Sequence, residues 1–195
     1  MTQRVKYASI GIAVLLVLFA SGCDNKKPSS DNFKAVLQKH YDDTPLCMSW
    51  LDIDLTRDGK LSPTAGYRDS ALLAALEKNG MLVSQGNGQN AVYSIPSDQR
   101  SNWKIQQAGL GSTMNIPCYG HAHVESVQSY TEPASAAGVN LSQVTYTWKA
   151  DKLLPWATDP GVQGFLSRMK PIIEGQVVEN KKVMILTNNG WVPKE

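Results

Sequence analysis

Three side chains that could bind a metal ion alternate along one short segment. His121, His123 and Glu125 are separated by single residues, so on a β-strand all three would point to one face. Imidazole and carboxylate groups are suitable ligands for zinc. The alternative is structural, with Ala122 and Val124 pointing to the core and the polar residues facing water. We favour the structural interpretation, predict no cofactor, and keep the three polar residues as the candidates for a metal site.

Motifs for other kinds of catalysis are missing from the sequence. It contains no Gly-x-Ser-x-Gly nucleophile motif and no phosphate-binding loop of the Walker type. These observations favour a protein that is not an enzyme.

Residues 1–22 have the composition of an export signal. Arg4 and Lys6 precede an uncharged, mostly apolar run from Ala8 to Ala20, which would form a helix of about 20 Å. The hydrocarbon core of a bilayer is about 30 Å thick, so this run is short for a transmembrane span. We therefore predict a signal peptide.

The run Phe19-Ala20-Ser21-Gly22-Cys23 resembles the lipobox of bacterial lipoproteins. The resemblance implies cleavage after Gly22, a diacylglyceryl group on the Cys23 sulfur, and an acyl chain such as palmitate on the new amino group. Plain secretion is the alternative. Asp24 resembles the signal that retains enterobacterial lipoproteins in the inner membrane, with the outer membrane as the alternative. The chain is similar in this respect to small enterobacterial inner-membrane lipoproteins.

Two cysteines remain besides Cys23. In an exported protein Cys47 and Cys118 meet an oxidising compartment, which favours a disulfide between them over a reactive thiol or a metal ligand. Removal of residues 1–22 leaves 17 of the 19 Lys and Arg against 17 Asp and Glu. Because no basic excess remains, we expect no nucleic-acid partner.

The first half of the mature chain is expected to be rich in helix. Residues 23–31 would be the lipidated cysteine and a polar, flexible tether. Apolar spacing predicts helices over residues 32–42 and 69–78, followed by strands at 81–83 and 91–95 around a Gly-rich loop. This order resembles the last part of a winged-helix domain and assigns residues 32–96 to one subdomain.

The second half is expected to be an α+β subdomain over residues 97–195. Strands are predicted at 118–127, 144–148 and 183–187, with a helix over 160–175. The predicted fold class is therefore α+β, in which a helix-rich part precedes a small antiparallel sheet with one helix packed on it. Trp148, Trp156 and Trp191 are expected in the core, and an exposed aromatic patch is the alternative.

Together these features predict a lipid-anchored protein of the cell envelope that faces the periplasm from the inner membrane. We expect a non-enzymatic interaction or structural role, with an envelope protein as partner. One alternative is a periplasmic hydrolase or metal-dependent enzyme that uses His121, His123 and Glu125. Another is an immunity or inhibitor protein that blocks a toxin or a lysozyme.

Overall fold

A computed structural model describes residues 25–48, 60–61, 70–86, 91–107, 113–136, 138–162 and 169–194. The expected signal peptide, Cys23 and Asp24 lie outside these ranges. In the described part of the chain, no helix combines the length and the apolar character that crossing a bilayer requires.

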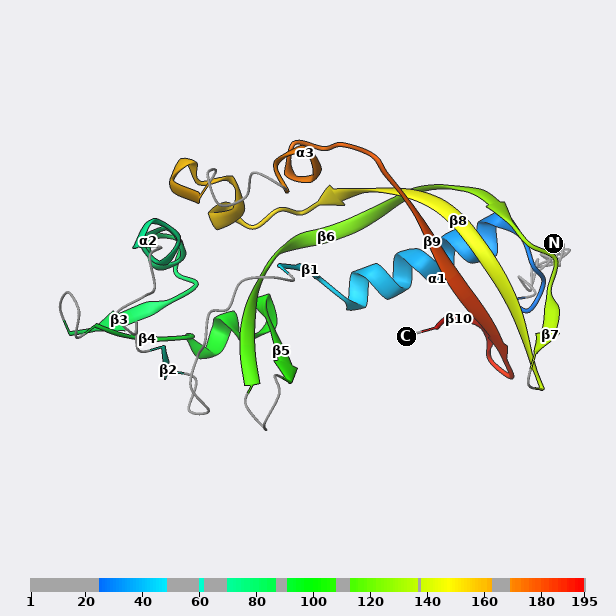
Figure 1. The fold of residues 1–195 in the computed structure, drawn as a ribbon, viewed down its shortest axis with the longest axis horizontal. Helices are drawn as coiled ribbons and strands as arrows, with labels where there is room; N and C mark the ends of the chain where they lie inside the picture. The colour runs from blue at the N-terminus through cyan, green and yellow to red at the C-terminus, as the bar shows by residue number, and fades with distance from the viewer. Residues whose placement is uncertain are drawn as a thin grey trace, which may run out of the picture.

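A curled antiparallel sheet forms most of the structure (Figure 1). Its strands follow the order β1-β6-β8-β9-β10, and β5 and β7 pair with β6 and β8 respectively. The strands are β1 Leu46–Cys47, β5 Trp103–Gln107, β6 Thr113–Tyr130, β7 Ala134–Ala136, β8 Val139–Asp151, β9 Val178–Thr187 and β10 Gly190–Pro193.

Strand β8 shows why this sheet has one covered face. Ser142, Val144, Tyr146 and Trp148 are buried at every second position, and the polar residues between them are more exposed. This alternation is typical of an antiparallel sheet with one face on the core and one face in water. The pairing of β6 with β8 also shifts register twice, between Val124 and Ser126 and between Val127 and Ser129. Such bulges increase the local twist, which accounts for the curl.

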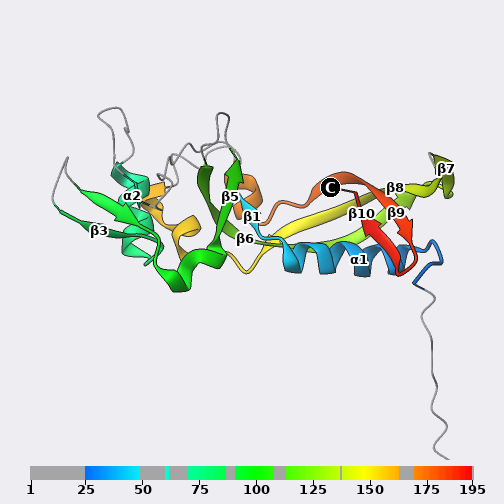
Figure 2. The same cartoon turned by 90° about the horizontal axis from the view of Figure 1, so that it is seen from below.

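Helix α1, Ser30–Asp43, lies along the concave side of the sheet (Figures 1 and 2). Its first turn is capped by Ser29, whose Oγ accepts a hydrogen bond from the backbone N of Asn32 at 3.3 Å. Phe33 and Leu37 lie one turn apart and are fully buried. They share a core with Ala122, Val124, Val144, Tyr146, Trp148, Met184 and Trp191.

A second lobe lies at the end of the molecule opposite to β7 and the β9–β10 turn (Figure 1). It contains helix α2, Ser70–Lys78, and a three-stranded sheet in the order β2-β4-β3. These strands are β2 Lys60–Leu61, β3 Val83–Gln85 and β4 Val92–Ser94. Short 3-10 turns at Ser97–Asn102, Pro155–Thr158 and Pro160–Val162 and the one-turn helix α3, Lys170–Ile173, complete the described elements.

Strand β6 takes part in both hydrophobic cores. Ile116 and Tyr119 pack with Leu72, Leu76 and Trp156 in the core of the second lobe. Ala122 and Val124, further along the same strand, pack with α1 in the other core. The two lobes are therefore joined through a continuous 18-residue strand.

The structure corrects the predicted fold class. The chain is predominantly antiparallel β-sheet with few and mostly short helices, and it is not a winged-helix α+β protein. The helices expected at 32–42 and 69–78 are confirmed as α1 and α2. The expected hairpin is also present, with β4 inside residues 91–95 but with β3 two residues later than the strand expected at 81–83. However, α1 packs on β6 and β10 of the large sheet rather than beside α2. An apolar stripe predicts that a helix buries one face, but it does not say against which strands.

The helix expected over residues 160–175 is also corrected in its described part. A 3-10 turn covers Pro160–Val162, and α3 covers only Lys170–Ile173, with residues 163–168 outside the described ranges. Gly175 has a φ of +90°, a left-handed conformation that ends a helix and favours glycine.

Candidate functional site

The segment before α1 is bound to one end of the large sheet. The indole Nε1 of Trp191 donates to the carbonyl oxygen of Lys26 at 3.0 Å. Asn32 Nδ2 donates to the carbonyl oxygen of Lys27 at 2.9 Å, and the Tyr130 hydroxyl donates to that of Pro28 at 3.4 Å. Three successive carbonyl groups of the expected tether are thus held by side chains of the folded domain.

Asn25 is held by the turn between β9 and β10. Its Nδ2 donates to the carbonyl oxygen of Asn189 at 3.0 Å. The next residue, Gly190, has a φ of +105°, and a Cβ added there would lie 2.9 Å from the carbonyl oxygen of Asn25. Glycine is therefore required here both by its backbone conformation and by the close approach of Asn25. We call residues 25–29, Tyr130 and residues 188–191 the proximal end.

Aromatic packing supports the proximal end from inside. The Phe33 ring lies edge-to-face against Tyr130 and against Trp191, with ring centroids 5.1 Å apart in each pair. Tyr130 and Trp191 are also the donors to Pro28 and Lys26. The same three rings therefore join the core to the segment that leads to residue 25.

Two polar side chains of α1 cover the edge of β6. The amide of Gln38 donates to the carbonyl oxygen of Ala122 at 3.1 Å and accepts from the backbone N of Val124 at 2.8 Å. Lys34 Nζ donates to the carbonyl oxygen of Glu125, beside the first register shift, at 2.8 Å. An open strand edge can pair with other chains, and α1 closes this one.

The strand predicted to carry His121, His123 and Glu125 is confirmed as part of β6. Ala122 and Val124 between them are buried, at 1% and 0% exposure, as the structural interpretation requires. His121 Nδ1 lies 3.1 Å from the carbonyl oxygen of Tyr41 in the last turn of α1, where a ring N–H donates to a helix C-terminus. No three His, Cys, Asp or Glu side chains among the described residues gather as metal ligands would.

Glu125 forms an ion pair with Lys149 on the neighbouring strand β8. Lys149 Nζ lies 2.6 Å from Glu125 Oε1. The hydrogen bond from Lys149 lowers the pKa of the Glu125 carboxyl, partly opposed by desolvation, and the same pair raises the pKa of the Lys149 ammonium. Glu125 is thus engaged in a cross-strand pair of the sheet surface.

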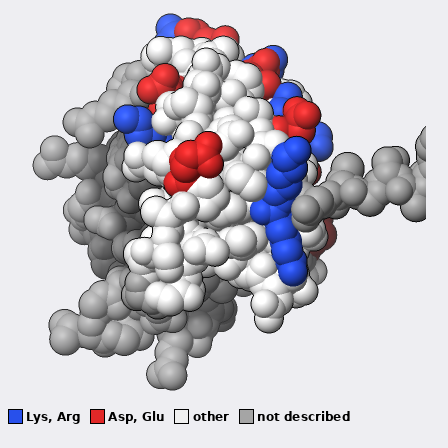
Figure 3. Space-filling view, turned by 90° about the vertical axis from the view of Figure 1, so that its right-hand side faces the viewer, with Lys and Arg blue, Asp and Glu red and all other residues white. Residues whose placement is uncertain are grey.

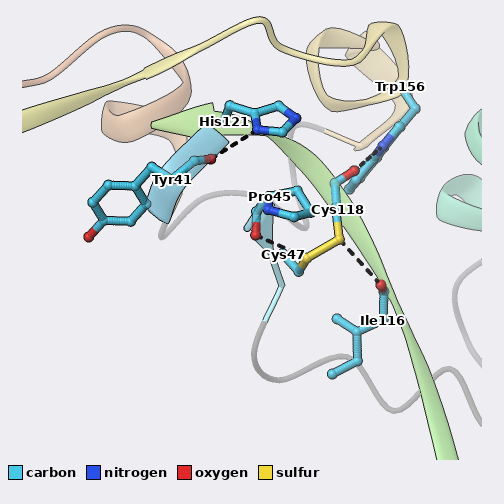
Figure 4. The surroundings of a disulfide bond; sticks show 7 residues. All are labelled: Tyr41, Pro45, Cys47, Ile116, Cys118, His121 and Trp156. Atoms are coloured by element: carbon cyan, nitrogen blue, oxygen red, sulfur yellow. Dashed lines mark hydrogen bonds between the residues drawn. A yellow bond between two sulfur atoms is a disulfide. The ribbon is translucent and has the colours of Figure 1, made fainter. Parts of the chain in front are cut away.

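The predicted disulfide between Cys47 and Cys118 is confirmed (Figure 4). The two residues are direct partners in the pairing of β1 with β6. Beside the bridge, the buried indole of Trp156 donates from Nε1 to the carbonyl oxygen of Cys118 at 2.9 Å. The disulfide therefore fixes β1, just after α1, where β6 enters the core of the second lobe.

The sequence did not predict that Tyr41 of α1 packs with the buried Tyr146 and Trp148 of β8. The hydroxyls of Tyr41 and Tyr146 lie 2.5 Å apart, and the Tyr41 ring stacks on Trp148. Burial raises the pKa of Tyr119 to about 12, and burial with the Tyr41 hydrogen bond raises that of Tyr146. The aromatic run at residues 146–148 indicated a core strand, but not the partner from α1.

These pKa shifts predict a late alkaline titration. At pH 11 only about a tenth of Tyr119 is expected to be ionised in the folded protein, against about nine tenths of an ordinary tyrosine. Because the pKa of Tyr119 is higher in the folded protein than in the unfolded chain, the free energy of unfolding is unaffected by this group below pH 10. It falls as the pH rises from 10 towards 12. Absorbance at 295 nm should show this late phase, and the Tyr119→Phe variant should reduce it. A folded protein whose tyrosines all titrate near pH 10 would contradict the assignment.

The alternative of an exposed tryptophan patch is wrong for all three residues that suggested it. Trp148, Trp156 and Trp191 are 7%, 0% and 3% exposed. The outer face of the sheet instead carries a row of aliphatic residues that cross-strand pairing aligns and that belong to neither core. The row comprises Ala134, Leu141, Ile185 and Val192.

Comparison of the chain with protein-family models, with curated proteins and with solved structures gives no match. The site is therefore interpreted from its own geometry, as the proximal end of a β-sheet protein that holds the segment following Cys23.

Proposed function

We propose that this protein is a lipid-anchored component of the cell envelope, attached through Cys23, facing the periplasm from the inner membrane, and acting by interaction rather than by catalysis. The observation that carries the proposal is the pairing of Cys47 with Cys118. A disulfide suits an exported protein, and this one uses both cysteines of the mature chain other than Cys23. Cys23 is thereby left for the modification that the lipobox resemblance implies.

The place of residue 25 supports the same proposal. Cys23 precedes by two residues a segment that is hydrogen-bonded to the folded domain. A cysteine in that position is an attachment point at the edge of the domain. Two or more acyl chains suffice for stable anchoring, since each buried methylene contributes about 0.8 kcal/mol.

The row of Ala134, Leu141, Ile185 and Val192 favours an interaction role. Val192 is 40% exposed, and the row crosses four adjacent strands on the face away from the core. Leu141 and Ile185 are partly exposed, and a partly exposed apolar row among polar residues suits contact with another macromolecule. The partner we propose is a protein of the envelope.

Labelling with radioactive palmitate in growing cells tests the anchor. We expect incorporation into the wild-type chain and none into Cys23→Ser, because the thiol that accepts the diacylglyceryl group is removed. Cys47→Ala/Cys118→Ala is the matched control: it also removes cysteine thiols but should incorporate label normally. Mass spectrometry should find the mature chain beginning at an acylated Cys23.

A wild-type chain that begins at Met1 with an unmodified Cys23 would overturn the anchor. Asp24→Ser tests in which membrane the protein is anchored. If Asp24 retains the protein in the inner membrane, the variant should move to the outer-membrane fraction of a density gradient.

Crosslinking in intact cells, followed by identification of the products, tests the interaction role. Replacement of Ile185 and Val192 by Ser should remove the crosslinked product if the aliphatic row is the contact.

A further inference from the structure

We propose that the proximal end rests in the headgroup layer of the bilayer and that the α2 lobe points away from the membrane. This inference depends on the proposed lipidation of Cys23. The occupant of the surface is thus a phospholipid bilayer, and the surface is formed by residues 25–27 and the turn at Asn188 and Asn189.

The length of chain between the anchor and the domain sets the distance to the membrane. Asn25 is two positions after Cys23, and an extended chain spans at most about 3.6 Å per residue, so the two backbones lie within about 7 Å. Each headgroup layer of a bilayer is about 5–8 Å thick. With the lipid chains of Cys23 in the membrane, Asn25 is therefore held at or inside the outer boundary of that layer.

Asn25 cannot move far from the domain without breaking several contacts. Its amide is bonded to Asn189, and the carbonyls of Lys26, Lys27 and Pro28 are each bonded to a side chain of the domain. The close approach to Gly190 fixes its backbone as well. The domain is therefore brought to the bilayer together with Asn25, and the β9–β10 turn comes with it.

The chemistry of the proximal end suits a headgroup layer. The turn residues Asn188 and Asn189 are exposed, polar and uncharged. Figure 3 views the molecule from this end, where most of the described surface is uncharged, a basic stripe runs along one side, and separate acidic and basic side chains are scattered over the rest of the face. Approach to lipid therefore desolvates few charges, and lysines near the surface of an anionic leaflet are attracted to it. Lys26 and Lys27 are exposed here.

The shape of the molecule then fixes what faces the periplasm. The proximal end and the α2 lobe lie at opposite ends of the longest axis (Figures 1 and 2). With the proximal end on the bilayer, α2, β3 and β4 are the elements farthest from it.

Fluorescence quenching in vesicles tests the orientation. The lipidated protein, with its disulfide oxidised, carries one environment-sensitive thiol label at Asn188→Cys, at Gln143→Cys on the outer face of β8, or at Ala74→Cys in α2. Each is reconstituted in phosphatidylethanolamine and phosphatidylglycerol vesicles that contain a headgroup nitroxide lipid. We expect several-fold stronger quenching of the Asn188 label than of the other two.

A longer tether is the matched control. Insertion of ten Gly and Ser residues after Asp24 keeps every residue of the domain and adds about 17 Å of root-mean-square reach. Quenching at Asn188 should then fall to the level at Ala74. Equal quenching at Asn188 and Gln143 would show a domain lying flat and would overturn the orientation. Mass spectrometry of the same samples reports lipidation, so a lipidated protein without quenching at Asn188 refutes only this inference, whereas an unmodified Cys23 refutes the proposed function.

Discussion

Replacement of both Cys47 and Cys118 by alanine is expected to lower the free energy of unfolding by about 4 kcal/mol, as the loop-entropy model predicts for a bridge between residues 71 positions apart. The bridge joins the two-residue strand β1 to β6. Without it, β1 keeps only short backbone pairing, and the unfolded chain gains the freedom that the closed loop removes. Urea denaturation followed by tryptophan fluorescence measures the change.

Reductant provides the control for this prediction. The reduced wild-type protein should have the same midpoint as the double alanine variant, and the variant should not respond to reductant. Tryptophan fluorescence should report unfolding around the bridge, because the Trp156 indole donates to the carbonyl oxygen of Cys118. An unchanged midpoint in the variant would show that the bridge contributes nothing to stability.

Replacement of Phe33 by alanine is expected to destabilise the protein by about 3–5 kcal/mol, the usual cost of removing a large buried aromatic side chain. Phe33 is fully buried and lies edge-to-face against Tyr130 and Trp191. Because those two rings also hold Pro28 and Lys26, the cavity should loosen the proximal end. Chemical denaturation measures the loss, and hydrogen exchange of α1 and β10 should locate it.

Two further variants separate the causes of that loss. Phe33→Leu keeps most of the apolar volume and should cost about 1–3 kcal/mol, since it removes two aromatic pairs that contribute about 0.5–1.5 kcal/mol each. Ile105→Ala removes an aliphatic side chain that is 69% exposed and should change stability by no more than about 0.5 kcal/mol. A Phe33→Ala variant as stable as Ile105→Ala would contradict the place of this ring in the core.

Local patterns in the sequence were sufficient for individual elements. The spacing of Phe33 and Leu37 predicted α1, and the alternation of Ala122 and Val124 with polar residues predicted the inward face of β6. The disulfide followed from the number of cysteines and the expected compartment. Each of these inferences needs only the pattern of neighbouring residues or the number of cysteines.

Contacts between distant segments could not be predicted in this way. Gln38 bonds to the edge of β6 more than 80 residues away, and Trp191 bonds to the carbonyl of Lys26 from 165 residues away. Polar composition alone made residues 23–31 resemble a flexible tether, because a backbone carbonyl gives no sign in the sequence of the side chain that will bind it. The winged-helix resemblance was wrong for the same reason, since it placed α1 by chain order.

The length of β6 has a mechanical consequence. Eighteen residues at about 3.4 Å each give a strand of at most about 60 Å, continuous between the two cores. Such a strand works as a spacer that sets the distance between the α2 lobe and the proximal end. Lengthening it by two residues would raise the lobe by about 7 Å with every side chain on its original face, whereas one added residue would turn the core face of the strand towards water.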